Sequence, residues 1–431
     1  MSGRTSQRVV VTGLGIVAPN GVGLDEFLSN LKSGISGIRS LPDLDELGFR
    51  CTVGGEPEVP QTTLDHFFTS LQQKRIIAQG VRFGVLAGLM AWEDSGMEIS
   101  AKSGRLEETG VIMGAGMSGG DVYGAGVLKV NDGQVKRLGS MTCPNSMSSS
   151  ASAFLGGIVG AGNQVTTNAS ACASGTEALI LGAERIRMGW AERMVCGACD
   201  SGSKYVRAGF DAMRVLNGKN NNDPQSASKP LSADAAGFVP GAGGGAYVLE
   251  SLSSARARGA RIYAEVLGGA INSGGQREGG TMTAPNPRAI ESVIQSALKQ
   301  ARVEAGSLDV ISGHLTATRF DPTEIKLWAQ ALDRRGEGFP PIQALKSMTG
   351  HALSAAGALE TVALCLQLHH GFLHPNINCE PIHPDILEVI SETQIPKTLK
   401  SAELTTGITA SFGFGDVNAC AILRKWNNDQ K

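Results

Sequence analysis

The sequence predicts a layered α/β fold made of two similar halves. Short apolar runs that favour strands alternate with longer segments whose apolar residues recur at helical spacing. In each half, a strand leads into a chemically reactive residue and then into a helix. The chain also holds 57 glycines among 431 residues, which indicates tight turns and close approach of backbones. Together these features favour parallel or mixed sheets covered by helices.

The first half is predicted to span residues 1–253. It opens with a buried strand at 8–17, "RVVVTGLGIV", which we expect to break at Gly13 and Gly15. The other elements expected in this half are helices at 80–96 and 175–189 and strands beginning near 109, 164, 192 and 244.

The second half is predicted to span residues 254–431 and to repeat the pattern. A helix at 288–303 is followed by a strand at 308–315 and a loop at 316–322. Residues 341–368 then read as a strand, a polar turn and a long helix.

Composition excludes several classes of protein. The net charge of −2 gives no global basic field for nucleic acid. Eight cysteines in a chain of this length do not form a disulfide framework. No apolar run of about 18 residues predicts a membrane span, and the N-terminus lacks a signal-peptide pattern. We therefore expect a cytoplasmic protein with reduced thiols.

Cys172 is the first candidate reactive residue. It lies in "NASACASGTE", at the start of a predicted helix, where the helix dipole is expected to lower the pKa of the thiol. Its small neighbours, Ala171, Ala173, Ser174 and Gly175, are expected to leave room for a substrate. The alternative is a buried cysteine that only fills the core.

Two histidines and a lysine extend the candidate site. His314 follows a strand, and Lys346 and His351 share one turn. Two neutral imidazoles could stabilise the enolate formed when a thioester loses CO₂, and a nearby Lys346 would keep them neutral. Cys172 would hold the other acyl group as a thioester. A papain-like hydrolase is the alternative for Cys plus His, but its local signature is missing.

At these residues the chain resembles the β-ketoacyl-[acyl carrier protein] synthases, the KAS I/II condensing enzymes of the thiolase superfamily. The resemblance covers nearly the whole chain, and it implies a thiolase-like fold with duplicated halves in an α-β-α-β-α arrangement. Its markers are "ACASG" at Cys172, "HLTAT" at His314, "KSMTGHALSAAGALE" from Lys346 to Glu360, and "GFG" at 413–415.

The resemblance implies roles for these residues. Cys172, His314 and His351 would form the catalytic triad. The backbone N–H groups of Cys172 and Phe414 would form the oxyanion hole. Phe414 would also be a gatekeeper ring, which the flanking Gly413 and Gly415 would allow to swing.

Further assignments concern the surroundings of the triad. Lys346 and Glu360 would form a buried ion pair, and Met117 would limit the length of the acyl chain. The other residues expected to contact substrate are Thr316 and Thr318, which would bind the phosphopantetheine arm, and Phe210, Phe412 and Gly413. The basic residues expected to meet the acidic carrier protein are Lys74, Arg75, Lys136, Arg137 and Arg214.

Several positions depart from the family pattern. Leu315 and Ala317 are bulkier than the usual glycines of the His-Gly-Thr-Gly-Thr motif, and the run to its acidic residue is one residue short. The turn within "GFVPGAGGGAYVLE" lacks its usual glutamate. Asp416 and Val417 replace a Gly and a Thr after the gatekeeper turn, and Asp416 could alter gate motion or bring a polar group to the channel. These differences put the substrate in doubt and favour a specialised subgroup.

The resemblance implies decarboxylative Claisen condensation of a Cys-bound acyl chain with malonyl carrier protein, in fatty acid or polyene/polyketide-type biosynthesis. It implies no metal or cofactor beyond the carrier's phosphopantetheine. Expected partners are acyl carrier protein and a second subunit, identical or homologous.

One alternative function is that of a non-catalytic chain-length-factor subunit, although such subunits typically lack the cysteine. Another is a degradative thiolase with Cys420 as second cysteine, but Cys420 reads as strand core, and so does the "CGAC" of 196–199.

Overall fold

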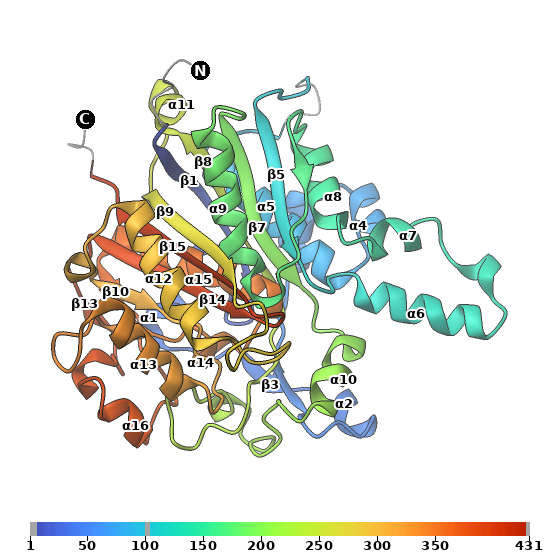
Figure 1. The fold of residues 1–431 in the computed structure, drawn as a ribbon. Coiled ribbons are helices and arrows are strands. Elements are labelled where there is room, and N and C mark those ends of the chain that lie inside the picture. The colour runs from blue at the N-terminus through green and yellow to red at the C-terminus, as the bar shows by residue number, and fades with distance from the viewer. Residues whose placement is uncertain (1–6, 100–103, 428–431) are drawn as a thin grey trace.

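A computed structural model describes residues 7–99 and 104–427 of the chain. Its centre is an eleven-stranded mixed sheet (Figure 1). The strands of this sheet are β1 (Val9–Ala18), β2 (Gly21–Val22), β5 (Thr109–Ala115), β6 (Val165–Thr166), β7 (Arg193–Asp200), β8 (Gly243–Ser251), β9 (Ala264–Ser273), β10 (Val310–Ser312), β11 (Ile342–Gln343), β14 (Thr406–Gly413) and β15 (Val417–Lys425). Two small sheets pair β3 (Ile38–Ser40) with β4 (Val53–Gly55) and β12 (Phe372–Leu373) with β13 (Lys400–Ser401).

The two ends of the large sheet have the same topology. From the middle outward, the order is β1-β8-β7-β5-β6 in one direction and β9-β15-β14-β10-β11 in the other. In both series the first two pairings are antiparallel and the last two are parallel. Strands β1 and β9 join the series through three antiparallel residue pairs. Two halves with one pattern are therefore present, as the sequence predicted.

Helices cover the sheet in layers. Helix α5 (Gln79–Asp94) packs on the outer face of the β1–β8–β7 region, and α12 (Pro287–Ala301) on the outer face of β9 and β15. Helices α9 (Ser174–Arg187) and α15 (Ala356–His370) lie between the two series and contact strands of both (Figure 1). The predicted α-β-α-β-α arrangement is confirmed. One apolar core surrounds the central helices α9 and α15, and two others lie beneath the outer helices.

The remaining helices flank these layers. They are α1 (Leu24–Ser33), α2 (Pro42–Glu46), α3 (Gln61–Phe67), α4 (Ser70–Arg75), α6 (Gly120–Asn131), α7 (Thr142–Ser146), α8 (Ser150–Val159), α10 (Lys204–Ala212), α11 (Leu252–Ala257), α13 (Asp321–Leu332), α14 (Lys346–Thr349) and α16 (Pro384–Leu387). None of the helices among the described residues is long and apolar enough to cross a membrane.

Strand β1 differs from its prediction. It continues through Gly13 and Gly15, with an irregularity of register between Val11 and Gly13. A Cβ on Gly13 would lie 2.1 Å from the carbonyl oxygen of Ala91, and one on Gly15 would lie 2.0 Å from that of Ala87. These glycines therefore let α5 pack directly on the strand instead of ending it.

The length of β6 and the division between the two halves can also be compared with the sequence-based predictions. The strand expected to begin near 164 pairs only at Val165–Thr166, because the chain then turns toward Cys172. The proposed division between residues 253 and 254 falls within α11, between the last strand of one series and the first of the other. That division stays a prediction.

Candidate active site

Cys172 lies at the entry to α9. It is the middle residue of a 3₁₀ turn, Ala171–Ala173, that runs directly into the helix. The turn is tight, because Ala171 has a left-handed φ of 46°. The hydroxyl of Ser174 accepts the N–H of Ser170 at 2.9 Å and donates to the carbonyl of Ala171 at 2.7 Å. These bonds hold the backbone that presents the sulfur.

The small residues around Cys172 serve packing rather than substrate space. A Cβ on Gly175 would lie 2.3 Å from the backbone nitrogen of Ala358, so this glycine lets α9 approach α15. Neither Gly175 nor Ser174 lines the cavity in front of the sulfur. The expectation that the small neighbours leave room for substrate is therefore wrong.

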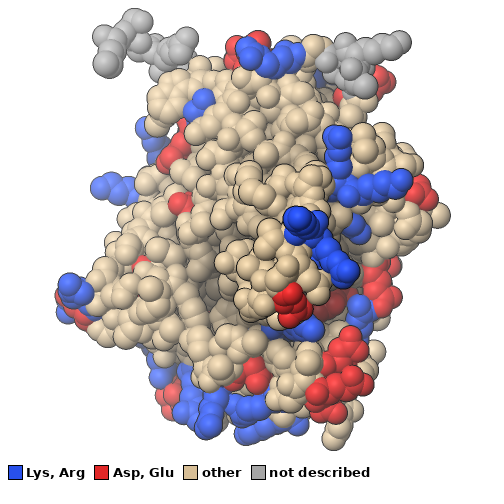
Figure 2. All heavy atoms as spheres, turned by 90° about the vertical axis from the view of Figure 1, so that its right-hand side faces the viewer, with Lys and Arg blue, Asp and Glu red and all other residues tan. Residues whose placement is uncertain are grey.

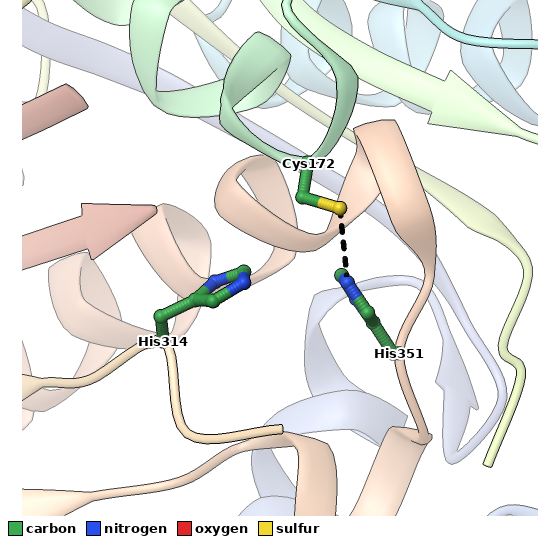
Figure 3. A group of neighbouring side chains, drawn as sticks. All are labelled: Cys172, His314 and His351. Atoms are coloured by element: carbon green, nitrogen blue, oxygen red, sulfur yellow. Dashed lines mark hydrogen bonds between the residues drawn. The ribbon is translucent and has the colours of Figure 1, made fainter. Parts of the chain in front are cut away.

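His314 and His351 converge on the sulfur (Figure 3). His351 Nε2 lies 3.1 Å from Cys172 Sγ, and the two imidazole rings meet edge to face with centroids 5.4 Å apart. The three side chains offer donor atoms that all lie within 4.8 Å of one another, close enough to share a reacting group or, in another chemistry, one metal ion. All three residues are buried.

Burial sets the protonation states. It lowers the pKa of both His314 and His351 well below the ordinary range, and the charge of Lys346 lowers them further. Burial also raises the pKa of the Cys172 thiol to about 11, although Lys346 and the N–H of Phe414 oppose the shift. The predicted lowering of the thiol pKa is wrong because desolvation outweighs these stabilising groups. The site holds a neutral thiol beside a neutral imidazole.

Lys346 and Glu360 form the expected buried ion pair. Lys346 begins α14 and Glu360 lies in α15, and their side chains are 2% and 1% exposed. Burial raises the pKa of Glu360 to about 7, with Lys346 acting in the opposite direction. The pair places one fixed cation near the triad, where it disfavours a second positive charge on either histidine.

Two acidic residues to which the sequence analysis gave no structural role hold the His314 loop. Glu324 accepts the N–H groups of His314 and Leu315 at 2.7 and 2.9 Å. Asp321 accepts that of Thr316 at 3.0 Å, and those of Ala317 and Thr318 at 3.1 and 3.3 Å. Both carboxyls are buried in the first turn of α13, and burial raises their pKa values to about 6 and about 7 for Asp321 and Glu324. The signal that could have found them is a pair of acidic residues directly after the histidine motif.

Phe414 begins the turn between β14 and β15. Its N–H lies close enough to the sulfur of Cys172 to lower the pKa of the thiol, and its ring centroid lies 6.1 Å from that of Phe210. Gly413 is required for another reason than ring motion, since a Cβ there would lie 2.8 Å from the carbonyl oxygen of Ser170. Gly415 does adopt a left-handed φ of 92°. The backbone at Gly413 therefore packs directly against the backbone of Ser170–Ala173.

Asp416 is buried and does not line the cavity. Its carboxylate accepts the N–H of Asn286 at 2.8 Å and that of Gln276 at 2.9 Å. Its carbonyl accepts the N–H of Gly274 at 2.9 Å. Of the two roles left open from the sequence, a polar contact in the channel is excluded in this conformation. The residue joins the Phe414 turn to the loop 274–286.

Most of the predicted substrate contacts share one cavity of about 280 Å³ with the triad. Thr316 and Thr318 line it, with their hydroxyl oxygens 3.1 Å apart. The cavity is also lined by Phe210, Phe412, Gly413 and Phe414. Met117 lines a separate cavity of about 460 Å³ beside α6 and is half exposed, so the structure does not bring it to the triad.

The predicted docking residues lie at the surface on different elements. Lys74 and Arg75 end α4, Lys136 and Arg137 lie in a 3₁₀ turn after α6, and Arg214 follows α10. All five are exposed. The face that carries α6 and α7 shows Lys and Arg in separate groups rather than one continuous patch (Figure 2).

The remaining candidate residues belong to the core. Cys196 and Cys199 lie in β7 and Cys420 in β15, all fully buried, and burial raises their thiol pKa values. Their reading as packing residues is confirmed. Leu315 is also fully buried in a core cluster, and Ala317 adopts a left-handed φ of 60° where the family pattern has glycine.

Comparisons with known proteins match this chain to one protein family over nearly its whole length. Residues 6–255 match the family model "Beta-ketoacyl synthase, N-terminal domain", and residues 263–380 match "Beta-ketoacyl synthase, C-terminal domain". The 3-oxoacyl-[acyl-carrier-protein] synthase 1 of Escherichia coli (strain K12) is 32% identical, covering 97% of this chain and 99% of that protein. The ketoacyl synthase alpha subunit of the tetracenomycin polyketide synthase of Streptomyces glaucescens is 31% identical, covering 99% of both.

Solved structures of ketosynthases are also similar to this chain. A type II polyketide ketosynthase in complex with its acyl carrier protein superimposes with a TM-score of 0.86 at 30% identity, covering 98% of this chain and all of that one. The ishigamide ketosynthase/chain length factor gives 0.87 at 28% identity with the same coverage. With two matching domain models and full-length relatives above 30% identity, the chain belongs to the β-ketoacyl synthase family.

Proposed function

We propose that this protein is a β-ketoacyl-[acyl carrier protein] synthase whose triad is Cys172, His314 and His351. One observation carries the proposal. A thiol and two neutral imidazoles meet in a buried cavity lined by two threonines, with two backbone N–H groups at the sulfur. This arrangement suits acyl transfer to sulfur followed by enolate formation.

The first step loads the acyl chain. His351 Nε2, 3.1 Å from the sulfur, accepts the thiol proton as Cys172 attacks the acyl thioester of the carrier. The N–H groups of Cys172 and Phe414 stabilise the tetrahedral oxyanion, each worth roughly 3 kcal/mol. When the intermediate collapses, the carrier's sulfur leaves and takes the proton back from His351. The acyl chain is then a thioester of Cys172.

The second step forms the carbon–carbon bond. Malonyl carrier protein loses CO₂, and the electron pair of the broken bond forms an enolate. Neutral His314 and His351 each donate an N–H to the enolate oxygen. The enolate carbon attacks the Cys172 thioester and expels the thiolate, which takes up a proton from water because its pKa is about 11. The product is a β-ketoacyl carrier two carbons longer.

His351 must accept a proton in one step and donate one in the other. A neutral imidazole does both by changing tautomer. Within the described residues, Nδ1 of His314 and of His351 has no hydrogen-bond partner, so no protein group holds a proton at Nδ1. The thiol at Nε2 of His351 loses its proton once Cys172 is acylated, and Nε2 can then carry a proton of its own. This freedom supports the use of one residue in both steps.

The proposed partners are acyl carrier protein and a second subunit. Helix α6 projects from the body of the molecule (Figure 1) and exposes Tyr123, Val127 and Leu128, which favours a subunit interface. The subunit would be identical or homologous. Eight free cysteines suit the reducing cytoplasm that we propose as its location.

The test is reconstitution with acyl and malonyl carrier proteins. We expect release of CO₂ and a β-ketoacyl product, both lost in His314→Ala and His351→Ala. His66→Ala is the matched control, since His66 is an exposed histidine paired with Glu93. If product appears only after addition of a homologous subunit and survives Cys172→Ala, the proposal is overturned in favour of a chain-length-factor role.

A further inference from the structure

A buried carboxyl group that none of the reaction steps uses lies behind the triad. Asp200 is the last residue of β7 and is 1% exposed. Its Oδ1 accepts the N–H groups of Ser201 and Met117 at 3.0 and 3.2 Å. Its Oδ2 lies 2.8 Å from the hydroxyl of Ser354 and 3.4 Å from the N–H of the same residue. Four donors around one carboxyl group suit its ionised form.

Ser354 connects this carboxylate to the ends of two neighbouring strands. Its hydroxyl lies 2.8 Å from the carbonyl oxygen of Cys199 in β7, and it accepts the N–H of Gly116, the residue after β5, at 3.0 Å. A Cβ on Gly116 would lie 2.6 Å from Asp200 Oδ2, so the carboxylate fills the space beside this glycine. Ser354 is therefore fixed to the central sheet by its side chain.

Ser354 also belongs to the turn that follows His351. The 3₁₀ turn Leu353–Ala355 joins His351 to α15 and contacts the turn that carries Cys172. Leu353 lines the triad cavity and has a left-handed φ of 51°, which is unfavourable for a residue with a side chain. Such a conformation persists only where the surroundings hold it. The contacts of Ser354, the next residue, supply that hold.

The charge of Asp200 also reaches the sulfur. Burial is the main cause of the raised pKa of the Cys172 thiol, and the charge of Asp200 adds to it, whereas the charge of Lys346 acts against it. Asp200 therefore acts on the Cys172 side of the site through its charge, and on the His351 side through Ser354.

We propose that Asp200 is a positioning residue of this site, which acts through Ser354 to hold the His351 turn in place against Cys172. The inference rests on the proposed function, since it concerns the imidazole that takes the proton of the attacking thiol. Without the Ser354 hydroxyl, Leu353 is free to leave its left-handed conformation, and His351 shifts with it. Without the negative charge of Asp200, the thiolate of Cys172 becomes easier to form.

Alkylation of Cys172 by iodoacetamide tests the charge without any turnover. Mass spectrometry of the peptide that holds Cys172 gives the rate between pH 8 and pH 11. In Asp200→Asn we expect the profile to move to lower pH, with alkylation at pH 9 at least about threefold faster. Asp309→Asn is the matched control. Its carboxylate accepts the N–H groups of Thr405 and Thr406 at 2.7 and 2.9 Å, at the end of β10 opposite His314.

Acylation of Cys172 by an acyl carrier protein tests the geometry. Ser354→Ala keeps the carboxylate, so its alkylation profile should match that of the unmodified protein. Its acylation at pH 7 should be about tenfold slower or more, because a displaced base is costly. Ser251→Ala is the matched control. Ser251 is also fully buried and its hydroxyl bonds the carboxylate of Glu192, but it lies at the end of β8 away from His351.

The two variants separate the possible outcomes. Equal alkylation profiles in Asp200→Asn and Asp309→Asn overturn the proposal, and so does equal acylation by Ser354→Ala and Ser251→Ala. If Asp200→Asn does not fold, the acylation rate of Ser354→Ala decides alone. A failure of the unmodified protein to condense acyl and malonyl groups, with the alkylation shift present in Asp200→Asn, would instead refute only the proposed function.

Discussion

The carboxylate of Glu324 holds the backbone of His314, whose N–H it accepts at 2.7 Å. The same carboxylate accepts the N–H of Leu315, and both contacts are buried. The position of one triad imidazole therefore depends on a side chain in the next helix, ten residues further along the chain.

Glu324→Gln should change how stability depends on pH. Burial raises the pKa of Glu324 to about 7, above its value in the unfolded chain. The folded state therefore keeps a proton that the unfolded state has lost, and this contribution to the unfolding free energy declines as pH rises from about 4.5 to about 7. The decline has a slope of up to roughly 1.4 kcal/mol per pH unit.

Urea unfolding at pH 5 and pH 7.5 measures the effect. Glutamine does not titrate, so the difference between the two pH values should be smaller in Glu324→Gln than in the unmodified protein, and kcat should fall with it. Glu388→Gln, at an exposed position, is the control. An unchanged pH dependence would show that Glu324 is not the buried acid described here.

His351→Ala should alter the pH profile of Cys172 acylation. Because the pKa of the thiol is about 11, little thiolate exists at neutral pH without a base. Removing the base should slow acylation about 10²- to 10⁴-fold near pH 7. The rate should then rise with pH through pH 9 and beyond, whereas the unmodified protein should react at neutral pH. Stopped-flow measurement of the acylation rate across pH 6–10 checks this. If His351 is not the base, His351→Ala and the unmodified protein should show the same dependence of rate on pH.

Gly413→Ala should displace the Phe414 turn from Cys172. The added Cβ would lie 2.8 Å from the carbonyl oxygen of Ser170 and 3.2 Å from the nitrogen of Cys172. Overpacking of this kind costs about 1–3 kcal/mol, and loss of one oxyanion donor lowers kcat about 10²- to 10³-fold. Gly157→Ala is the control variant, since a Cβ at Gly157 would have no atom within 4 Å. Steady-state kinetics showing equal kcat for the two variants would count against the close approach.

Asp416→Ala should release the loop 274–286. It removes the acceptor of the Gln276 and Asn286 N–H groups, at a cost of about 2–4 kcal/mol in unfolding free energy. Hydrogen exchange at these two amides should accelerate. The exposed Asp43→Ala serves as control. Unchanged protection of both amides would mean that the loop is held by other contacts.

The sequence predicted α5, α9, α12 and α15 and the convergence of Cys172, His314 and His351, because strand–helix alternation and short motifs are local signals. It did not predict α6 or α13. It did not predict the raised pKa of Cys172, which depends on how the layers bury the thiol. Nor did it explain Asp416, whose partners are about 130 to 140 residues away in the chain. Contacts that arise only when distant segments meet leave no pattern near the residue itself.

The sequence also did not show why particular glycines are required. The sequence predicts a strand break at Gly13 and Gly15, and at Gly413 a glycine that lets the Phe414 ring swing. Each instead permits close contact with a segment far away in the chain, which is visible only when the neighbouring atoms are placed.

Mass spectrometry of the intact protein after incubation with an acyl carrier protein tests the central claim most directly. The account predicts one acyl group per chain, on the peptide that holds Cys172, with none in Cys172→Ala and slow formation in His351→Ala. An acyl group on a different residue, or one that persists in Cys172→Ala, would contradict it.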